Sequence, residues 1–229
     1  MKLIIIFAAI ILASCAERQS YYLRETNSIL SGQIKIYSDH TIVEGLLDHF
    51  PRKIKNDSVG LRAYPPSCPP TFECQAQYGD IELRVLKSDY LIELNELLSK
   101  KIEYQTVYND SNIIINLSEL RRSIFPVEKC NKWYDNKSPI PYFESYDFRL
   151  GVKEEKKILG GEEIPYFNYI YTIPSDLQVY VIEAKAGDFW KVSCNEARPE
   201  SLKEWKHGYS KGIAVSDSLG ILVFWAMIW

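Results

Sequence analysis

Residues 209–229 read YSKGIAVSDSLGILVFWAMIW, and this C-terminal stretch decides the fold. Two largely apolar runs, residues 209–217 and 221–229, flank a short polar stretch that ends at Gly220. This pattern predicts a β-hairpin with its turn around Ser218 to Gly220. In the second run both alternating sets of side chains are apolar, which is typical of a central strand covered on both faces. The two sets are Ile221, Val223, Trp225, Met227 and Trp229 on one face, and Leu222, Phe224, Ala226 and Ile228 on the other.

A last strand that ends on an aromatic residue also resembles the closing strand of an outer-membrane barrel. Such a barrel needs at least about eight strands of roughly ten residues, with alternating apolar and polar positions. The chain offers fewer strands, and two of its segments have helical spacing instead. The buried central strand is therefore the favoured interpretation of residues 221–229.

Three further segments have the pattern of strands. Residues 77–87 alternate apolar side chains with charged neighbours, which is the period of a half-buried strand. Residues 101–118 predict a hairpin with Asn109 to Asn112 as its turn. Residues 177–185, LQVYVIEAK, predict one more strand.

Two segments have apolar residues at helical spacing. Residues 38–50 follow the possible caps Ser38 and Asp39 and stop before Pro51, and residues 88–101 carry a stripe of leucines. Together with the strands, these helices predict an α+β fold. We expect a mostly antiparallel sheet with two helices and a C-terminal hairpin.

The N-terminus has the pattern of a secretory signal. Lys2 precedes the apolar run 3–12, small residues follow at positions 13 and 14, and Cys15 comes next. As a helix, about ten apolar residues cover roughly 15 Å, half of the ~30 Å hydrocarbon layer of a bilayer. The run is therefore too short for a permanent transmembrane helix.

The tetrapeptide Leu12-Ala13-Ser14-Cys15 resembles the lipobox of bacterial lipoprotein precursors. This resemblance implies cleavage before Cys15, a diacylglycerol on its thiol, and a further acyl chain, such as palmitate, on the new amino group. Two or three acyl chains anchor a protein to a membrane almost permanently. In some bacteria an aspartate after the cysteine retains such proteins on the inner membrane, so Ala16 favours the outer membrane. The implied division is a signal peptide (1–14), a lipidated N-terminus and tether (15–32) and a single globular α+β domain (33–229).

Composition narrows the range of partners. The 229 residues carry a net charge of −3 and have no basic block, so we do not expect nucleic acid as a partner. With 13% aromatic and 25% charged residues, the chain has the composition of a folded protein with a substantial core. The expected contacts are a membrane through the lipid anchor and a protein or glycan partner.

Four cysteines remain after Cys15. Cys68 and Cys74 flank a proline-rich stretch and predict a local disulfide, which would leave Cys130 to pair with Cys194. The alternative is that some of these thiols stay reduced. The usual short C-x2-4-C pairs are absent and the three histidines are scattered, so we expect no metal site and no cofactor.

No familiar catalytic or phosphate-binding motif is present, and we assign no catalytic residue. The most interesting histidine is His207, because Trp205, His207 and Tyr209 would point to one side of an extended segment. Gly208 would allow another backbone to approach closely. The segment predicts either the rim of a ligand site or simply the packed start of the last hairpin.

Other candidate residues are less specific. His40 and His49 fall nine residues apart in the expected helix 38–50, on opposite sides, and we expect packing or surface roles for both. Trp133 and Tyr134 lie in a long proline-rich loop, where contact residues often occur, although sheets also favour aromatic residues.

The sequence therefore predicts a membrane-anchored lipoprotein of the cell envelope with a non-catalytic binding or interaction domain. Its partner would be a protein, as for an immunity protein that occludes a toxin, or a glycan. Two alternatives stay open: an envelope hydrolase that uses His207, and an accessory subunit of an envelope complex. The residues do not identify the partner.

Overall fold

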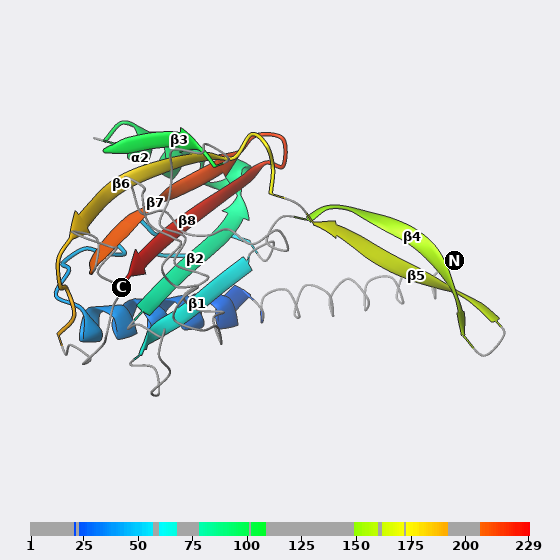
Figure 1. Cartoon of the computed structure of the whole chain (residues 1–229), viewed down its shortest axis with the longest axis horizontal. Coiled ribbons are helices and arrows are strands. Elements are labelled where there is room, and N and C mark those ends of the chain that lie inside the picture. Colours follow the sequence, from blue (N-terminus) through cyan, green and yellow to red (C-terminus); the bar gives the residue numbers. More distant parts are fainter. Residues whose placement is uncertain are drawn as a thin grey trace, which may run out of the picture.

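A computed structural model describes residues 21, 23–56, 60–67, 78–100, 102–108, 149–159, 162–171, 173–191 and 207–229. Its centre is a six-stranded, fully antiparallel sheet (Figure 1). In spatial order the strands are β1 (Gly60–Ser67), β2 (Tyr78–Leu86), β8 (Ile221–Ile228), β7 (Gly208–Ser216), β6 (Gln178–Ala186) and β3 (Tyr104–Val107). The expected α+β fold with a mostly antiparallel sheet is confirmed.

Strand β8 lies between β2 and β7, and every residue from Leu222 to Trp229 is at most 1% exposed. Its two sets of side chains enter two separate apolar clusters. Leu222, Phe224, Ala226 and Ile228 join the larger cluster, and Val223, Trp225, Met227 and Trp229 join the other. The predicted central strand, covered on both faces, is therefore confirmed.

The β7–β8 turn spans residues 217–220 and is held by Asp176 from the chain before β6. The carboxylate of Asp176 accepts hydrogen bonds from the Ser218 amide (2.8 Å) and from the hydroxyls of Ser218 (2.8 Å) and Ser216 (2.9 Å). These bonds, the Ser218 amide first, lower the pKa of Asp176 because they favour the charged carboxylate. Gly220 completes the turn with a φ of 61°, a conformation that glycine adopts without strain.

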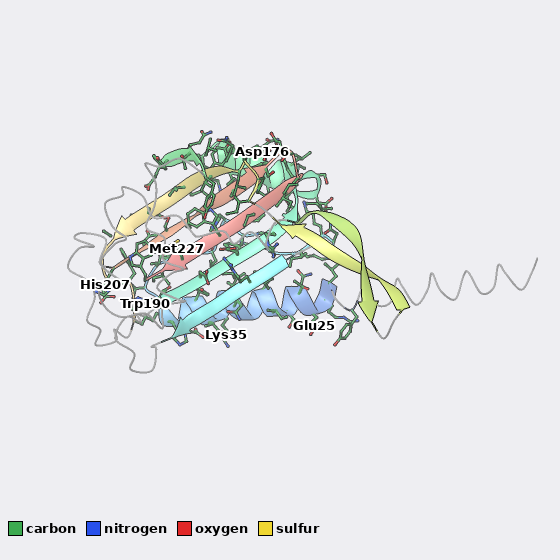
Figure 2. The ribbon with its side chains drawn as sticks, turned by 45° about the vertical axis from the view of Figure 1, so that its right-hand side comes forward. Glu25, Lys35, Asp176, Trp190, His207 and Met227 are labelled. Carbon is green, nitrogen blue, oxygen red and sulfur yellow. The ribbon has the colours of Figure 1, made fainter. Side chains whose placement is uncertain are left out.

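Helices cover the face of the sheet that carries the larger cluster. The N-terminal helix (residues 23–40) runs beside β1 and β2 and buries Leu30 and Tyr37 there (Figure 1). A short 3-10 helix, η1 (Lys87–Tyr90), leads into α2 (Leu91–Leu98), which buries Leu94 and Leu97 on the same face. On the outer side of the N-terminal helix, Glu25 and Lys35 point away from the sheet (Figure 2).

The position of the first helix differs from the sequence prediction. The predicted helix 38–50 is wrong: the helix ends at His40, and residues 44–49 form turns. Residues 41–43 are all β-branched, and Thr41 forms a bridge with Trp190 while the Ile42 amide donates to the Phe189 carbonyl. The Thr41 amide makes the last helical bond, to the Tyr37 carbonyl, whereas the Ile42 amide serves the neighbouring segment, so the helix does not continue beyond this point.

The start of the N-terminal helix changes the expected division of the chain. Residues 23–32, expected to belong to a tether, form the first half of the N-terminal helix. Within it, the Asn27 side chain bonds to the main chain at Ile54, accepting from its amide at 2.7 Å and donating to its carbonyl at 3.4 Å. Residues 23–32 are therefore part of the folded protein rather than a free linker.

The predicted helix 88–101 and the strands 77–87 and 177–185 correspond to α2, β2 and β6, with shorter bounds for the helix. Strand β3 falls in the predicted hairpin 101–118 and pairs with β6, whereas residues 109–118 lie outside the described residues. None of the helices in the described ranges is long and apolar enough to cross a membrane.

A second, two-stranded sheet stands apart from the first. Strands β4 (Arg149–Leu159) and β5 (Glu162–Tyr171) pair with each other and with no strand of the six-stranded sheet, and the ribbon they form extends away from it (Figure 1). This ribbon was not predicted from the sequence, although Gly160 and Gly161 between its two strands are a hairpin signal.

Candidate functional site

The structure describes three of the residues singled out in the segment around His207, namely His207, Gly208 and Tyr209. Tyr209 is buried: its ring meets Phe189 edge to face, with 4.7 Å between ring centroids. This burial fits the packing interpretation of Tyr209 rather than a ligand rim. His207 is half-buried at the start of β7, and its carbonyl accepts a hydrogen bond from the Gly187 amide (Figure 2).

Gly208 has the close contacts expected of it. A Cβ at this position would lie 2.7 Å from the Lys185 carbonyl oxygen and 2.8 Å from the Trp229 ring. The remaining site residues of the sequence analysis lie outside the described residues. They are Cys15, Cys68, Cys74, Cys130, Trp133, Tyr134, Cys194 and Trp205.

A polar network beside Tyr209 joins the sheet to the turns at residues 44–49. Glu183 of β6 pairs with Lys185 (2.5 Å) and Lys211 (3.0 Å), and Lys211 also donates to the Gly45 carbonyl (2.9 Å). Partial burial alone would raise the pKa of Glu183, but hydrogen bonds from Lys185, Lys211 and Tyr209 outweigh it and lower the pKa to about 2. Because Lys211 bonds both to Glu183 and to the Gly45 carbonyl, the network ties the turns to the sheet.

His49 lies in these turns, against the sheet. Its Nε2 donates to the Trp225 carbonyl at 2.9 Å, and its ring meets Phe50 edge to face. Burial lowers the pKa of His49 to about 3, so the imidazole is neutral and a very weak base near neutral pH. His40, at the end of the helix, contacts the Ile36 carbonyl through Nδ1 at 2.8 Å. The expected packing role fits His49 in particular.

An ionic cluster is buried between β1 and β2. Asp80 and Glu82 are 3% and 1% exposed, Arg62 forms an ion pair with Glu82, and its Nη2 lies 3.9 Å from Asp80 Oδ2. The strand register places these side chains on the same face as Trp225 and Met227. Buried carboxylates depend on a neighbouring cation, so the role of Arg62 is to compensate their charge.

We expect Arg62→Met to lower the free energy of unfolding by about 3 kcal/mol at pH 7, because two carboxylates then stay buried without this cation. Protonation neutralises carboxylates, so the loss should shrink as the pH falls. Urea denaturation at several pH values measures both effects. Arg52→Met, at an exposed arginine, is the control and should change stability by less than about 0.5 kcal/mol. A loss below about 1 kcal/mol for Arg62→Met would contradict this role.

Two half-open cavities lie on the helix-covered side of the protein. One, of about 400 Å³, surrounds Lys55, whose ammonium group contacts Glu93 (2.6 Å) and the Asp89 carbonyl (2.7 Å) and lies 4.6 Å from the centre of the Tyr90 ring. These contacts occupy the ammonium group. The charge of Lys55 in this cavity is therefore already paired within the protein.

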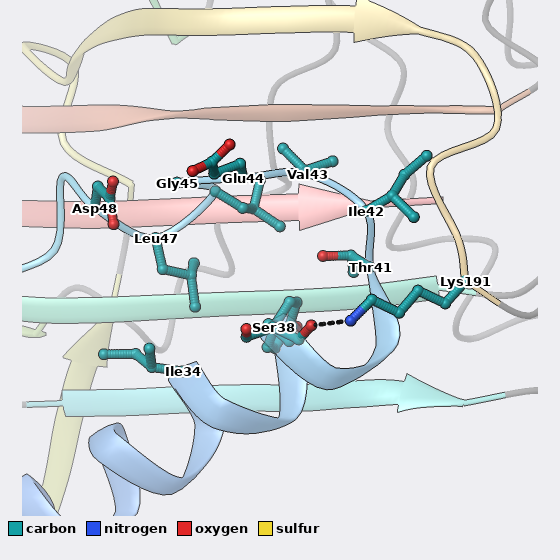
Figure 3. A pocket seen from close by; sticks show the side chains of 12 residues that line it. Ile34, Ser38, Thr41, Ile42, Val43, Glu44, Gly45, Leu47, Asp48 and Lys191 are labelled. Atoms are coloured by element: carbon teal, nitrogen blue, oxygen red, sulfur yellow. Dashed lines mark hydrogen bonds between the residues drawn. The ribbon is translucent and has the colours of Figure 1, made fainter.

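The other cavity, of about 390 Å³, lies between the end of the N-terminal helix and the turns that follow it (Figure 3). We call it the Thr41 cavity. It is lined by Ile34, Tyr37, Ser38, Thr41, Ile42, Val43, Glu44, Gly45, Leu46, Leu47, Asp48 and Lys191. Its lining combines aliphatic side chains with hydroxyls, two carboxylates and one ammonium group, which is typical of a site for a small amphipathic ligand.

Contacts from residues 189–191 fix the helix end at this cavity. The Lys191 amide donates to the His40 carbonyl (2.9 Å), and the Lys191 ammonium donates to the Ser38 carbonyl (2.8 Å), as Figure 3 shows. A cation at this end of a helix also complements its dipole. The wall formed by the helix is therefore held in place from a segment about 150 residues away in the chain.

Sequence reasoning missed the Thr41 cavity because it placed residues 38–50 in one helix. The available signal was Gly45, a residue that weakens a helical pattern. Its φ of 69° lies in the left-handed region, and the Asp48 side chain folds over it.

Comparisons with protein-family models, with curated proteins and with solved structures find no match to this chain. Within the described ranges, no three His, Cys, Asp or Glu side chains gather closely enough to hold a metal ion. The features that bear on function are therefore the N-terminal residues 1–15 and the Thr41 cavity. The hydrolase and accessory-subunit alternatives stay predictions.

Proposed function

We propose that this protein is a lipid-anchored lipoprotein of the bacterial cell envelope whose folded part is a binding domain. The observation that carries the proposal is the sequence Leu12-Ala13-Ser14-Cys15 after a short apolar run, with its resemblance to a lipobox. Cys15 would carry the acyl chains, and the outer membrane is the favoured location.

The start of the folded part supports this arrangement. Only residues 16–22 separate Cys15 from the helical residues 23–40. Even fully extended, seven residues span at most about 25 Å. The sheet and its cavities would therefore stay close to the membrane surface, in reach of ligands and partners of the envelope.

The geometry favours binding as the task of the folded part. The Thr41 cavity has a volume within the range of small-molecule sites, and it offers polar groups on a largely aliphatic wall. The half-buried His49, which lines the cavity around Lys55, is held neutral by its surroundings and bonded to Trp225. The volume and the mixed lining of the Thr41 cavity suit the recognition of a small ligand, and this supports a binding domain.

Metabolic labelling with a radioactive fatty acid tests the anchor. In a bacterial host, the wild-type chain should carry the label and fractionate with membranes. Cys15→Ala should abolish the label and release the protein from the membrane fraction, because the thiol is the attachment point. Ser14→Ala is the matched control, since it keeps a small residue before the cysteine and should leave labelling intact. An unlabelled wild type, or label that persists in Cys15→Ala, would refute the anchor.

A further inference from the structure

The Thr41 hydroxyl is a buried polar group that no described residue satisfies. Thr41 is 4% exposed, and its Oγ1 has no hydrogen-bond partner in the part of the chain that the structure describes. Figure 3 shows this hydroxyl pointing into the Thr41 cavity, between the helix end and the following turns. Buried hydroxyls are almost always hydrogen-bonded, so one that faces a cavity indicates a bonding partner inside the cavity.

The charges around the cavity indicate the sign of that partner. The carboxylates of Glu44 and Asp48 both line it, and neither forms a hydrogen bond or ion pair with another described residue. Among the described residues of the lining, one ammonium group is present, that of Lys191, and it is bonded to the Ser38 carbonyl. The C-terminal end of the helix adds partial negative charge. The cavity therefore favours a cation over an anion.

The rest of the lining is aliphatic. Ile34, Val43, Leu46 and Leu47 form the wall between the polar groups, and Ile42, 59% exposed, lies at the mouth. An inorganic cation would leave this apolar surface facing water. A ligand with a short hydrocarbon part would cover it and gain from its burial.

We propose that the Thr41 cavity binds a small aliphatic amine. The ammonium group donates a hydrogen bond to the Thr41 hydroxyl, the carboxylates of Glu44 and Asp48 attract its charge, and the hydrocarbon part packs against Leu46 and Leu47. The amine is either a free molecule or the side chain of a lysine on a partner. This inference rests on the proposed binding role and is independent of the lipid anchor.

Titrations followed by NMR test the proposal on the full chain in detergent micelles, labelled with ¹⁵N. Adding n-butylamine at pH 7 should cause saturable shifts at the amides of residues 41–48. n-Butanol and pentanoate have the same butyl chain and should bind at least about tenfold more weakly, because neither carries the positive charge that the two carboxylates attract. Equal binding of n-butanol, no saturable shift, or shifts confined to other residues would overturn the proposal.

Variants connect the binding to the named residues. Thr41→Val keeps the shape of the side chain and should weaken n-butylamine binding about three- to tenfold, the value of one hydrogen bond. Its melting temperature should equal or exceed that of the wild type, because an unsatisfied buried hydroxyl is removed. Glu44→Gln with Asp48→Asn should weaken binding further. Glu96→Gln, an acid that lines the other cavity, is the control and should bind normally. Wild-type affinity in both test variants would overturn the proposal.

A second probe distinguishes the two sources of the amine. Nα-acetyl-lysine methylamide presents the same ammonium on a peptide-like backbone. Tighter binding of this probe than of n-butylamine assigns the cavity to a lysine of a protein partner, and weaker binding assigns it to a free amine. Fatty-acid labelling measures only the acylation of Cys15. The absence of amine binding and the absence of a lipid anchor are therefore separate results.

Discussion

Gly212→Ala is expected to abolish or nearly abolish folding, with a loss of unfolding free energy above about 4 kcal/mol. A Cβ at position 212 would overlap the Tyr180 carbonyl oxygen of β6 and would lie 2.6 Å from Cζ2 of Trp225. The first of these atoms belongs to the backbone of a paired strand and cannot rotate away. The second belongs to an indole ring with no exposed surface, in one of the two apolar clusters.

Circular dichroism and urea denaturation of the purified variant measure this loss. Gly32→Ala is the matched control, because a Cβ at this helical position has nothing within 4 Å. It should leave stability unchanged or raise it by up to about 1 kcal/mol, since alanine favours helices more than glycine. Trp225→Leu in the Gly212→Ala background should not rescue folding, because the Tyr180 oxygen remains. A folded Gly212→Ala protein near wild-type stability would contradict the close approach.

The C-terminal hairpin could be predicted because its signals are local. A strand that is apolar on both faces, preceded by a glycine-ended turn, is visible in residues 209–229 without knowledge of the rest. The role of Gly212 is only half visible. A glycine inside a strand indicates a close approach or a bulge. That the approaching atom belongs to Tyr180 follows from the irregular β6–β7 register between Val181 and Glu183.

The first helix shows how two patterns compete. Leu30, Ile34 and Tyr37 have helical spacing and face the core, but Gly32 between them lowers the helix propensity of the segment. Residues 42–50 have an equally good apolar spacing. Which of the two segments is helical depends on Phe189–Lys191, a segment far along the chain that pairs with residues 40–42. No local pattern contains that information.

The Thr41 cavity could not be predicted for the same reason. One wall is the end of the N-terminal helix, which Lys191 holds in place. The sequence pattern predicted a helix at residues 38–50 instead. The residues that composition and motifs emphasised were aromatic residues and His207. Of these, Tyr209 belongs to the packing of the sheet. An unsatisfied hydroxyl becomes visible only when the atoms around it are placed.

His49 should make the protein sensitive to acid well above the range in which carboxylates titrate. Burial lowers its pKa from 6.5 to about 3 in the folded protein. On acidification the unfolded chain therefore binds a proton first, so the unfolding free energy is highest above about pH 6.5 and falls as the pH approaches 3. At about pH 3.5 the expected loss from His49 alone is about 4 kcal/mol, at about 1.4 kcal/mol per pH unit.

His49→Gln should remove this part of the acid sensitivity, because glutamine stays neutral and its amide nitrogen can replace Nε2 as donor to the Trp225 carbonyl. Urea denaturation between pH 7.5 and 3.5 measures the difference. The wild type should lose stability from about pH 6.5 downward. The variant should lose it only from about pH 4.5, where the stabilisation that comes from the lowered pKa values of Glu183 and Asp176 begins to disappear. His40→Gln removes an exposed imidazole and should keep the wild-type profile. Parallel curves for wild type and His49→Gln would show that the buried ring is not the acid-sensitive group.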